Sequence, residues 1–482
     1  MNANVRLPSS EPVVGRAAGW AVPVLVALAA VLYVACARGN LWLDEILSLQ
    51  WARNAKSWTD LLALFRHDNN HPLNSLWLYA VGMGQQPLLY RAVSIAAGVG
   101  SLVLLDRIAK RLVPRARLFV LAMAATSYAL AVYFSEARGY AVAVFCALLC
   151  FWILLVRKDR PGIAVTTAFW VASLAGILSH ATFIYPLGGM GAWVVASAFG
   201  NGRRPWSVPA RAALWFGIPF ALFAGYYFFY LRQMLIAGGP DLDPLQIAAE
   251  FFGYGLGLPV RPPFSYFTVV VSVLGLGAAI GFGKFSGGRL RVFFVSTLVV
   301  LPCIGLAATR PEYLHFRYFL VLLPFVLLAL GGLIERALAA DFRRAWIFVF
   351  LLAVSAAFQW PRFSALLTLG RGGYPEILAR LSEAGGSATF SATHDMMGGL
   401  VMEHYRRGII PPPAVHFVPA ARVGERIPEW FLVVDQSDPP AAAPGQFAVF
   451  DRTYEFDKAA YAAPVSGAHW FLYRLKSQTT TN

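Results

Sequence analysis

Long apolar runs recur along this chain of 482 residues, from near the N-terminus to about residue 360. A helix needs about 20 apolar residues to cross the hydrocarbon core of a bilayer, and these runs have about that length. Only 13% of the residues are charged, about half the share in soluble domains. The sequence predicts an α-helical polytopic membrane protein with about eleven transmembrane helices, at residues 17–37, 87–106, 117–134, 140–156, 163–179, 182–200, 211–230, 264–283, 291–308, 318–335 and 345–360.

The formal net charge of +15 is carried mostly by short connections between the predicted spans. Such connections face the cytoplasm and meet anionic headgroups, so the charge does not indicate nucleic-acid binding. The first run is too long for a cleavable signal, and we expect it to be retained as a span. An odd number of crossings from a cytoplasmic N-terminus then places the chain after residue 360 outside the plasma (inner) membrane. The basic connections are 107–117, 157–160, 203–211, 284–291 and 336–344.

The character of the chain changes after the last apolar run. We predict a transmembrane domain over residues 1–362 and a small extracytoplasmic α/β domain over 363–482. Within the first outer loop, 39–86, residues 71–84 form a helix that lies in the membrane interface, where Trp and Tyr are favoured. In the second domain the patterns indicate helices at 374–383 and 396–407 and strands at 388–391, 431–434, 447–450 and 470–475.

An acidic pair, Asp44-Glu45, follows the first span directly and lies among apolar and aromatic residues. A carboxylate packed against membrane spans is costly to keep and usually has a task. The pair either divides into a general base and a metal ligand or holds a divalent cation jointly; alternatively, it stabilises a helix N-terminus through the helix dipole. His71 is a further candidate ligand for a metal or a phosphate. We predict Asp44 and Glu45 as catalytic residues, and Asp44, Glu45 and His71 as a candidate site for Mg²⁺ or Mn²⁺.

Arginines stand at two other outer turns, where the positive-inside rule disfavours them. Arg138 follows Glu136 in one turn, and Arg317-Tyr318 opens a late span. A guanidinium at the membrane surface suits a lipid phosphate, because its fixed fork binds the oxygens in pairs. The alternatives are a Glu136 to Arg138 pair that neutralises itself and arginines that meet only headgroups. The possible additions to the site from the outer turns are Glu136, His180, Arg310 and His315.

These motifs together resemble the GT-C superfamily of glycosyltransferases. The acidic pair, the His71-Pro72 step, the Ser-x-Glu-x-Arg-x-Tyr turn and the Arg317-Tyr318 step occur in the family's order and on one side of the membrane. The protein O-mannosyltransferase and aminoarabinose lipid A transferase branch is the most similar, and the resemblance covers residues 17–360. The family commonly has a second proline where this chain has Leu73-Asn74.

The resemblance also implies roles for individual residues. Asp44 activates the acceptor or organises a metal ion, and Glu45 is its partner. The outer C-terminal domain covers the site. Relatives of the aminoarabinose type carry a carboxylate where this chain has Asn70, so the chain departs there from a metal-binding pattern. The residues that the resemblance assigns to the carrier's phosphate are His71, Arg138, Tyr140, Arg317 and Tyr318.

The activity that this resemblance implies is transfer of a hexose or pentose from a polyprenyl-monophosphate carrier to an extracytoplasmic acceptor by an inverting displacement. An envelope lipid such as lipid A, a polysaccharide and a protein are all open as acceptors. The main alternative is a transporter or flippase of a lipid-linked saccharide, which places charged residues near the bilayer midplane. A scaffold whose outer tail binds a partner is a third reading. The charged motifs stand at span ends, which favours surface chemistry; we expect the lipid-linked sugar and membrane lipid as partners, and no nucleic acid.

Overall fold

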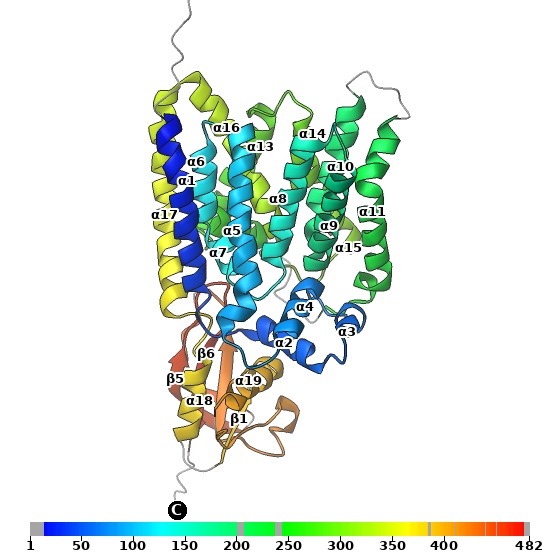
Figure 1. The fold of residues 1–482 in the computed structure, drawn as a ribbon. Coiled ribbons are helices and arrows are strands. Elements are labelled where there is room, and N and C mark those ends of the chain that lie inside the picture. Colours follow the sequence, from blue (N-terminus) through cyan, green and yellow to red (C-terminus); the bar gives the residue numbers. More distant parts are fainter. Residues whose placement is uncertain are drawn as a thin grey trace, which may run out of the picture.

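The computed structural model describes residues 14–199, 207–236, 243–383, 387–409, 411–438, 440–449 and 451–476. The predicted connection 203–211 therefore lies partly outside the described residues, as do the last residues of two predicted elements, Gly200 and Phe450. A bundle of long helices carries a small α/β domain at one end, which we call the domain end (Figure 1). We call the opposite end of the bundle the far end.

In the described part of the chain, eight helices are long and apolar enough to cross a membrane, or nine if the bent pair α6 and α7 forms one span. Two shorter apolar helices lie at Trp20–Cys36 and Ile163–Ser179. Each of the predicted spans coincides with one of these segments, so the predicted polytopic helical fold is confirmed. The helices are α1 (Val14–Cys36), α5 (Pro87–Leu112), α6 (Arg117–Ala125), α7 (Tyr128–Phe134), α8 (Tyr140–Arg157), α9 (Ile163–Ser179), α10 (Ile184–Phe199), α11 (Ser207–Phe229), α13 (Phe264–Phe282), α14 (Leu290–Val295) with α15 (Leu301–Thr309), α16 (Leu323–Ala340) and α17 (Ala345–Thr368).

The first loop folds into three short helices at the domain end: α2 (Leu43–Asn54), α3 (Trp58–Ala63) and α4 (Pro72–Val81) (Figure 1). Helix α4 is the predicted interfacial helix. It begins with a proline in its first turn, where the missing N–H has no helical partner to lose. It ends at Gly82, whose φ of 78° is a left-handed conformation that glycine adopts without strain.

Helix α12 (Pro244–Leu256) was not predicted. The side chain of Asp243 caps its N-terminus by accepting hydrogen bonds from Leu245 N and Gln246 N. Its 13 residues are too few to cross a bilayer. The second half of the helix is buried and packs against α7 and the start of the span at Phe316–Ala340, close to the domain end.

The C-terminal domain is a six-stranded mixed sheet in the order β2-β1-β3-β6-β5-β4. Strand β1 runs parallel to β2 and β3, and the other neighbours are antiparallel. Both predicted helices and all four predicted strands are present, whereas β2 and β5 were missed. The elements are α18 (Tyr374–Glu383), a π-helical segment (Met396–Val401) with α19 (Met402–Arg407), β1 (Ala388–Ala392), β2 (Val415–Phe417), β3 (Trp430–Asp435), β4 (Gln446–Val449), β5 (Arg452–Ala460) and β6 (His469–Leu475).

The domain packs on the first loop through one continuous apolar cluster. It joins Ile46 and Leu49 of α2 to residues of α18, α19 and the sheet. The hydroxyl of Tyr405 donates to Leu41 O over 2.6 Å. Helix α17 runs to Thr368, beyond the predicted domain boundary at 362, because its apolar pattern continues through Pro361 to the glycine-rich turn that starts at Gly370.

Arg371 fastens the domain to the helical bundle. This side chain is 1% exposed, and its Nη1 lies 2.6 Å from Glu136 Oε1. Its Nη2 donates to Val132 O, Ser135 O and Ser135 Oγ, which closes the end of α7. A residue of the interdomain turn thus reaches the loop that leads into α8.

Replacing Arg371 by Ala should lower the free energy of unfolding by about 3–5 kcal/mol, because it leaves the Glu136 carboxylate buried without its partner. The measurement is the melting temperature of the purified variant in detergent, which should be lower than that of the unchanged protein. The matched control is Arg380→Ala, which removes a partly exposed pair with Asp457 and should change the melting temperature little. Equal effects of the two changes would contradict the fastening role.

Candidate active site

Glu45 holds two segments of the chain together beneath the site. Its carboxylate accepts hydrogen bonds from Arg91 Nε over 2.8 Å and Arg91 Nη2 over 2.6 Å. It also accepts from the backbone N–H groups of Trp42 and Ala137. Burial would raise the pKa of Glu45, but the guanidinium of Arg91 outweighs it and the pKa is lowered. All of these donors stabilise the carboxylate in place, so Glu45 positions the chain.

The turn between α7 and α8 is shaped by close backbone contact. A Cβ on Gly139 would lie 2.0 Å from Ser179 O at the end of α9 and 3.0 Å from His71 Cβ. Only glycine lets the turn approach α9 and α4 this closely. Two further contacts hold the turn: Ala137 N donates a hydrogen bond to Glu45, and Arg371 forms an ion pair with Glu136. Residues from four separate parts of the chain therefore fix the position of Arg138.

Glu136 is buried under this turn, and its Oε2 has no hydrogen-bond partner among the described residues. Burial, opposed by the charge of Arg371 and reinforced by the carboxylate of Glu45, raises the pKa of Glu136 from 4.5 to about 7. The folded protein thus holds this proton more tightly than the unfolded chain does. The stability that it contributes is present below pH 4.5 and is lost as the pH rises through about 7.

A Glu136→Gln variant should lack this part of the pH dependence. We expect the melting temperature of the unchanged protein to fall relative to that of the variant as the pH rises from 4.5 to about 7. Melting curves of both proteins over this range give the comparison. Parallel curves would show that Glu136 does not take up a proton on folding.

Asp44 lies between two arginines that come from distant parts of the chain. Its Oδ2 lies 2.6 Å from Arg138 Nη1 and 3.3 Å from Arg317 Nη1. Asn69 joins the group, because its Oδ1 accepts from Arg138 Nη2 over 2.6 Å and its Nδ2 donates to Asp44 O over 2.8 Å. The site thus brings a carboxylate and two guanidinium groups together at the domain end of the bundle.

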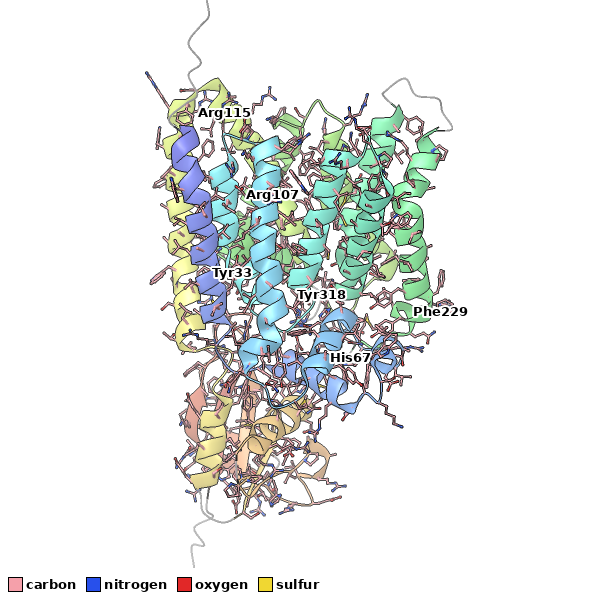
Figure 2. All side chains as sticks on the ribbon, viewed as in Figure 1. Tyr33, His67, Arg107, Arg115, Phe229 and Tyr318 are labelled. Atoms are coloured by element: carbon pink, nitrogen blue, oxygen red, sulfur yellow. The ribbon has the colours of Figure 1, made fainter. Side chains whose placement is uncertain are left out.

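Histidine and tyrosine rings form a wall beside this charged group. The ring of Tyr140 lies 5.1 Å from that of His71 and 4.7 Å from that of His180, between ring centroids. Tyr318 extends the wall, 5.9 Å from His180 and 5.7 Å from His315. The guanidinium of Arg138 lies 5.0 Å from the centre of the Tyr140 ring. Tyr318 lies just inside the bundle, next to the first loop (Figure 2).

The histidines of the wall are neutral at physiological pH. Burial and the nearby Arg138 lower the pKa of His71 well below its usual value. Burial and the two arginines lower the pKa of His180 to about 3 and that of His315 to about 2. His71 Nδ1 lies 2.9 Å from Ser179 O and must donate to that carbonyl, so its Nε2 carries a lone pair. His180 Nδ1 accepts from Thr182 N, so its Nε2 carries the proton.

Several buried polar atoms of the site have no hydrogen-bond partner among the described residues. Buried polar groups are nearly always paired, so such a concentration calls for a ligand. The atoms belong to both arginines and to the ring wall, and they offer donors as well as an acceptor. They are His71 Nε2, Arg138 Nε, Tyr140 Oη and Arg317 Nε.

The structure brings most of the predicted site residues together. The charged group and the ring wall beside it contain eight of them: Asp44, His71, Arg138, Tyr140, His180, His315, Arg317 and Tyr318. Glu45 and Glu136 lie outside this group, because Glu45 is bound to the buried Arg91 and Glu136 is bound to the buried Arg371. The alternative reading, in which Glu136 and Arg138 neutralise each other, is wrong, because Glu136 pairs with Arg371 and Arg138 pairs with Asp44. Arg310 is exposed and makes no described ion pair.

The predicted metal ligands do not converge. Asp44 binds Arg138, Glu45 binds Arg91, and Nδ1 of His71 is used by Ser179 O. Among the described residues no group of three or more His, Cys, Asp and Glu side chains is arranged to hold a metal ion. These three residues do not fit a Mg²⁺ or Mn²⁺ site.

Three residues that organise the site were not predicted. Asn69 links Asp44 to Arg138, and its only signal was a polar stretch before α4. Arg91 and Arg371 are buried arginines. Their signal in the sequence was a charge at the start of a span for Arg91 and a charge in a glycine-rich turn for Arg371. Their partners are far away in the sequence, so the sequence alone does not pair them.

The fold is similar to two solved structures of ArnT from Cupriavidus metallidurans. The crystal structure of the apo state is 14% identical, covers 88% of this chain and 94% of that one, and has a TM-score of 0.52. The structure bound to undecaprenyl phosphate is 13% identical, covers 95% of this chain and 98% of that one, and has the same TM-score of 0.52. No protein-family model matches the sequence, and neither does any curated protein.

At these identities the likeness establishes the fold. The chain is a multi-pass membrane protein, and the predicted GT-C-like fold, with its small C-terminal domain, is confirmed. The fold is similar to that of ArnT, an aminoarabinose lipid A transferase.

Proposed function

We propose that this chain is a membrane glycosyltransferase that moves a sugar from a polyprenyl monophosphate to a hydroxyl acceptor. The observation that carries the proposal is the pair of guanidinium groups of Arg138 and Arg317 around Asp44, each with an Nε–H that has no partner in the described part of the chain. A phosphate bound between them satisfies these donors. The binding of undecaprenyl phosphate by ArnT, which has the same fold, supports this class of carrier.

The charges of the site suit a sugar linked to a lipid phosphate. Asp44, Arg138 and Arg317 sum to one positive charge, and the neighbouring histidines are neutral. A phosphodiester carries one negative charge and balances this excess. The departing polyprenyl phosphate gains a second negative charge, which the same guanidinium groups stabilise as it develops.

The ion pairs of Asp44 explain how binding and activation are coupled. In the absence of donor, the Asp44 carboxylate occupies the guanidinium groups that a phosphate would use. The donor phosphate replaces it, and the freed carboxylate accepts the proton of the acceptor hydroxyl. The hydroxyl oxygen then forms a bond to the anomeric carbon while the bond from that carbon to the phosphate oxygen breaks, with inversion. No step of this proposal passes through a divalent cation.

The ring wall supplies polar groups for the sugar. His71 Nε2 accepts a hydrogen bond from a sugar hydroxyl, because its other nitrogen donates to Ser179 O. His180 Nε2–H donates one, because its Nδ1 accepts from Thr182 N. The faces of Tyr140 and Tyr318 provide the apolar surface on which a sugar ring packs.

The charge asymmetry of the bundle supports a site outside the cytoplasm. Arg107 and Arg115 lie toward the far end (Figure 2), as expected for connections that face the cytoplasm. The domain end, with the site and the α/β domain, then lies on the outer side of the plasma (inner) membrane. The acceptor is an extracytoplasmic molecule of the cell envelope: a lipid such as lipid A, a polysaccharide or a protein.

A reconstituted assay tests the function. The purified full chain in lipid nanodiscs is given undecaprenyl-phosphate-linked hexoses and pentoses with each class of acceptor, and release of undecaprenyl phosphate is measured. We expect release that depends on one donor and one acceptor class. Absence of release, together with movement of the intact lipid-linked sugar across the bilayer in vesicles, would favour a flippase instead.

A further inference from the structure

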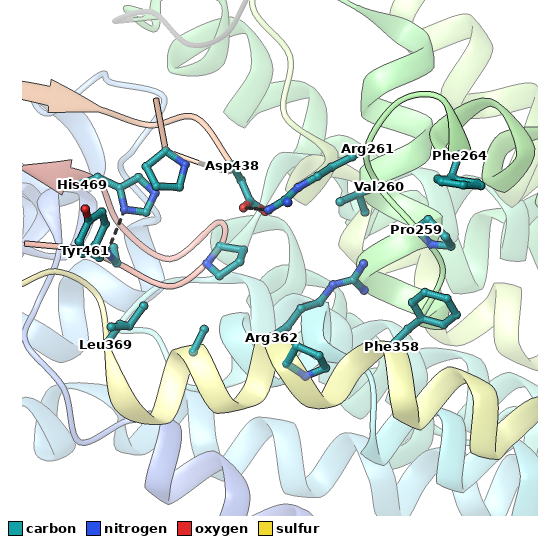
Figure 3. Close-up of a pocket in the computed structure, with 15 residues that line it drawn as sticks. Pro259, Val260, Arg261, Phe264, Phe358, Arg362, Leu369, Asp438, Tyr461 and His469 are labelled. Atoms are coloured by element: carbon teal, nitrogen blue, oxygen red, sulfur yellow. Dashed lines mark hydrogen bonds and ion pairs between the residues drawn. The ribbon is translucent and has the colours of Figure 1, made fainter. Parts of the chain in front are cut away.

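A cavity lies where the helical bundle meets the C-terminal domain, and none of the residues that line it belongs to the candidate active site. Its volume is about 530 Å³. The loop after α12, one side of α17 and two loops of the α/β domain surround it (Figure 3). The residues that carry the argument are Arg261, Phe264, Phe358, Arg362, Leu369 and Asp438.

The polar side of this cavity has an excess of positive charge. The side chains of Arg261 and Asp438 lie next to each other at the cavity (Figure 3). Arg261 Nη2 lies 2.6 Å from Asp438 Oδ1, and the Arg261 side chain is still 54% exposed. Arg362 makes no described ion pair. Its Nη1 donates to Gly253 O and Gln359 Oε1, and its Nη2 donates to Leu258 O. A guanidinium has five N–H groups, so its Nε–H and one Nη2–H have no partner among the described residues.

The other side of the cavity is apolar and faces the region occupied by lipid chains. Phe264 is 63% exposed, and Phe358 and Leu369 are each 45% exposed. In the apolar stretches of α13 and α17, only 22% and 17% of the residues are buried inside the protein. Large exposed apolar faces on membrane helices contact lipid. A ligand that enters this cavity therefore meets hydrocarbon on one side and guanidinium groups on the other.

We propose that this cavity binds a lipid with an anionic phosphate headgroup, at a site separate from that of the sugar donor. The phosphate bridges Arg261 and Arg362, whose planar groups bind phosphate oxygens in pairs. The acyl chains lie along α13 and α17, over Phe264 and Phe358. Two arginines against one aspartate leave one positive charge for the phosphate, and Asp438 competes with it for Arg261.

One layer of aromatic side chains separates the proposed lipid site from the candidate active site. The hydroxyl of Tyr254 donates to Asp438 Oδ2 over 3.0 Å. The ring of Tyr254 lies 5.6 Å from that of Phe316, the residue before Arg317. The proposal stands on this cavity alone and does not depend on the sugar-transfer reaction.

The experiment is native mass spectrometry of the purified full chain titrated with dioleoyl phosphatidylglycerol. Arg261→Ala should weaken formation of the one-lipid adduct about tenfold, the effect of losing one charge-assisted hydrogen bond. Asp438→Asn should strengthen it, because it removes the competing charge while its amide oxygen still accepts from Tyr254. The control is Arg380→Ala, which removes an arginine paired with Asp457 within the C-terminal domain and should leave binding unchanged.

Opposite effects of the two changes are the signature of a phosphate site, since a purely structural pair would respond to both in the same direction. Changes in the same direction, or equal adducts in all variants, would overturn the proposal. Loss of the adduct in Arg317→Ala but not in Arg261→Ala would place the lipid at the candidate active site instead. Full displacement by millimolar inorganic phosphate would identify the ligand as a soluble phosphate compound and reject the lipid.

Discussion

Replacing Asp44 by Asn should reduce sugar transfer about a thousandfold, the usual effect of losing a general base. The amide keeps the shape of the side chain and still accepts a hydrogen bond from Arg138. It does not take a proton from the acceptor hydroxyl. The same change should tighten the binding of undecaprenyl phosphate, because a neutral side chain no longer competes for Arg138 and Arg317.

These two effects of Asp44→Asn are measured by transfer kinetics and by a binding titration on the same preparation. Asp60→Asn is the matched control in the same loop. This carboxylate accepts from the backbone N–H groups of Lys56 and Ser57 at the start of α3, away from the arginines. Its replacement should leave transfer unchanged. Transfer by Asp44→Asn at the original rate would remove Asp44 from the mechanism.

Replacing Arg138 by Gln should lower transfer about a hundredfold to a thousandfold, the range seen when a group that stabilises developing charge is lost. Arg138 has two tasks, since it holds Asp44 and Asn69 in place before the donor binds and then binds the phosphate that departs. Binding of undecaprenyl phosphate should weaken as well. In this respect Arg138→Gln differs from Asp44→Asn, which acts on the two quantities in opposite directions.

Two further variants separate charge from geometry at Arg138. Arg138→Lys keeps the charge but loses the fork that reaches two partners, so we expect transfer between those of the Gln variant and the unchanged protein. Arg310→Ala removes an exposed arginine from the same end of the bundle and should have no effect. Equal losses in Arg310→Ala and Arg138→Gln would mean that surface charge in general, and no specific phosphate site, supports activity.

The helical spans could be predicted because each depends on its own local sequence. An apolar run of sufficient length is both necessary and nearly sufficient for a membrane helix. Most strands of the C-terminal domain were predicted for the same reason. Strand β5 was missed because its sequence is rich in charged residues and only two of its nine residues are fully buried. Helix α12 was missed because it is shorter than a span and buried by residues far along the chain.

Most residues of the candidate site could be predicted, but the ion pairs that they form with one another could not. Asp44, Arg138 and Arg317 could be found because charges at the membrane surface are few and stand out. The role of Glu45 depends on Arg91, and that of Glu136 depends on Arg371, 235 residues further along the chain. Nothing local records such a pair. The adjacent pair Asp44-Glu45 therefore suggested two catalytic carboxylates, whereas in the fold Glu45 holds the turn that carries Arg138.

The central claim is that the phosphate of the carrier and the Asp44 carboxylate use the same two arginines in turn. A cryo-EM structure of the full chain with undecaprenyl phosphate tests it most directly. We predict phosphate density within hydrogen-bonding distance of the Nε atoms of Arg138 and Arg317, with the carboxylate of Asp44 moved away from both guanidinium groups. Phosphate bound elsewhere, with the ion pair of Asp44 and Arg138 still at its present 2.6 Å, would contradict the claim.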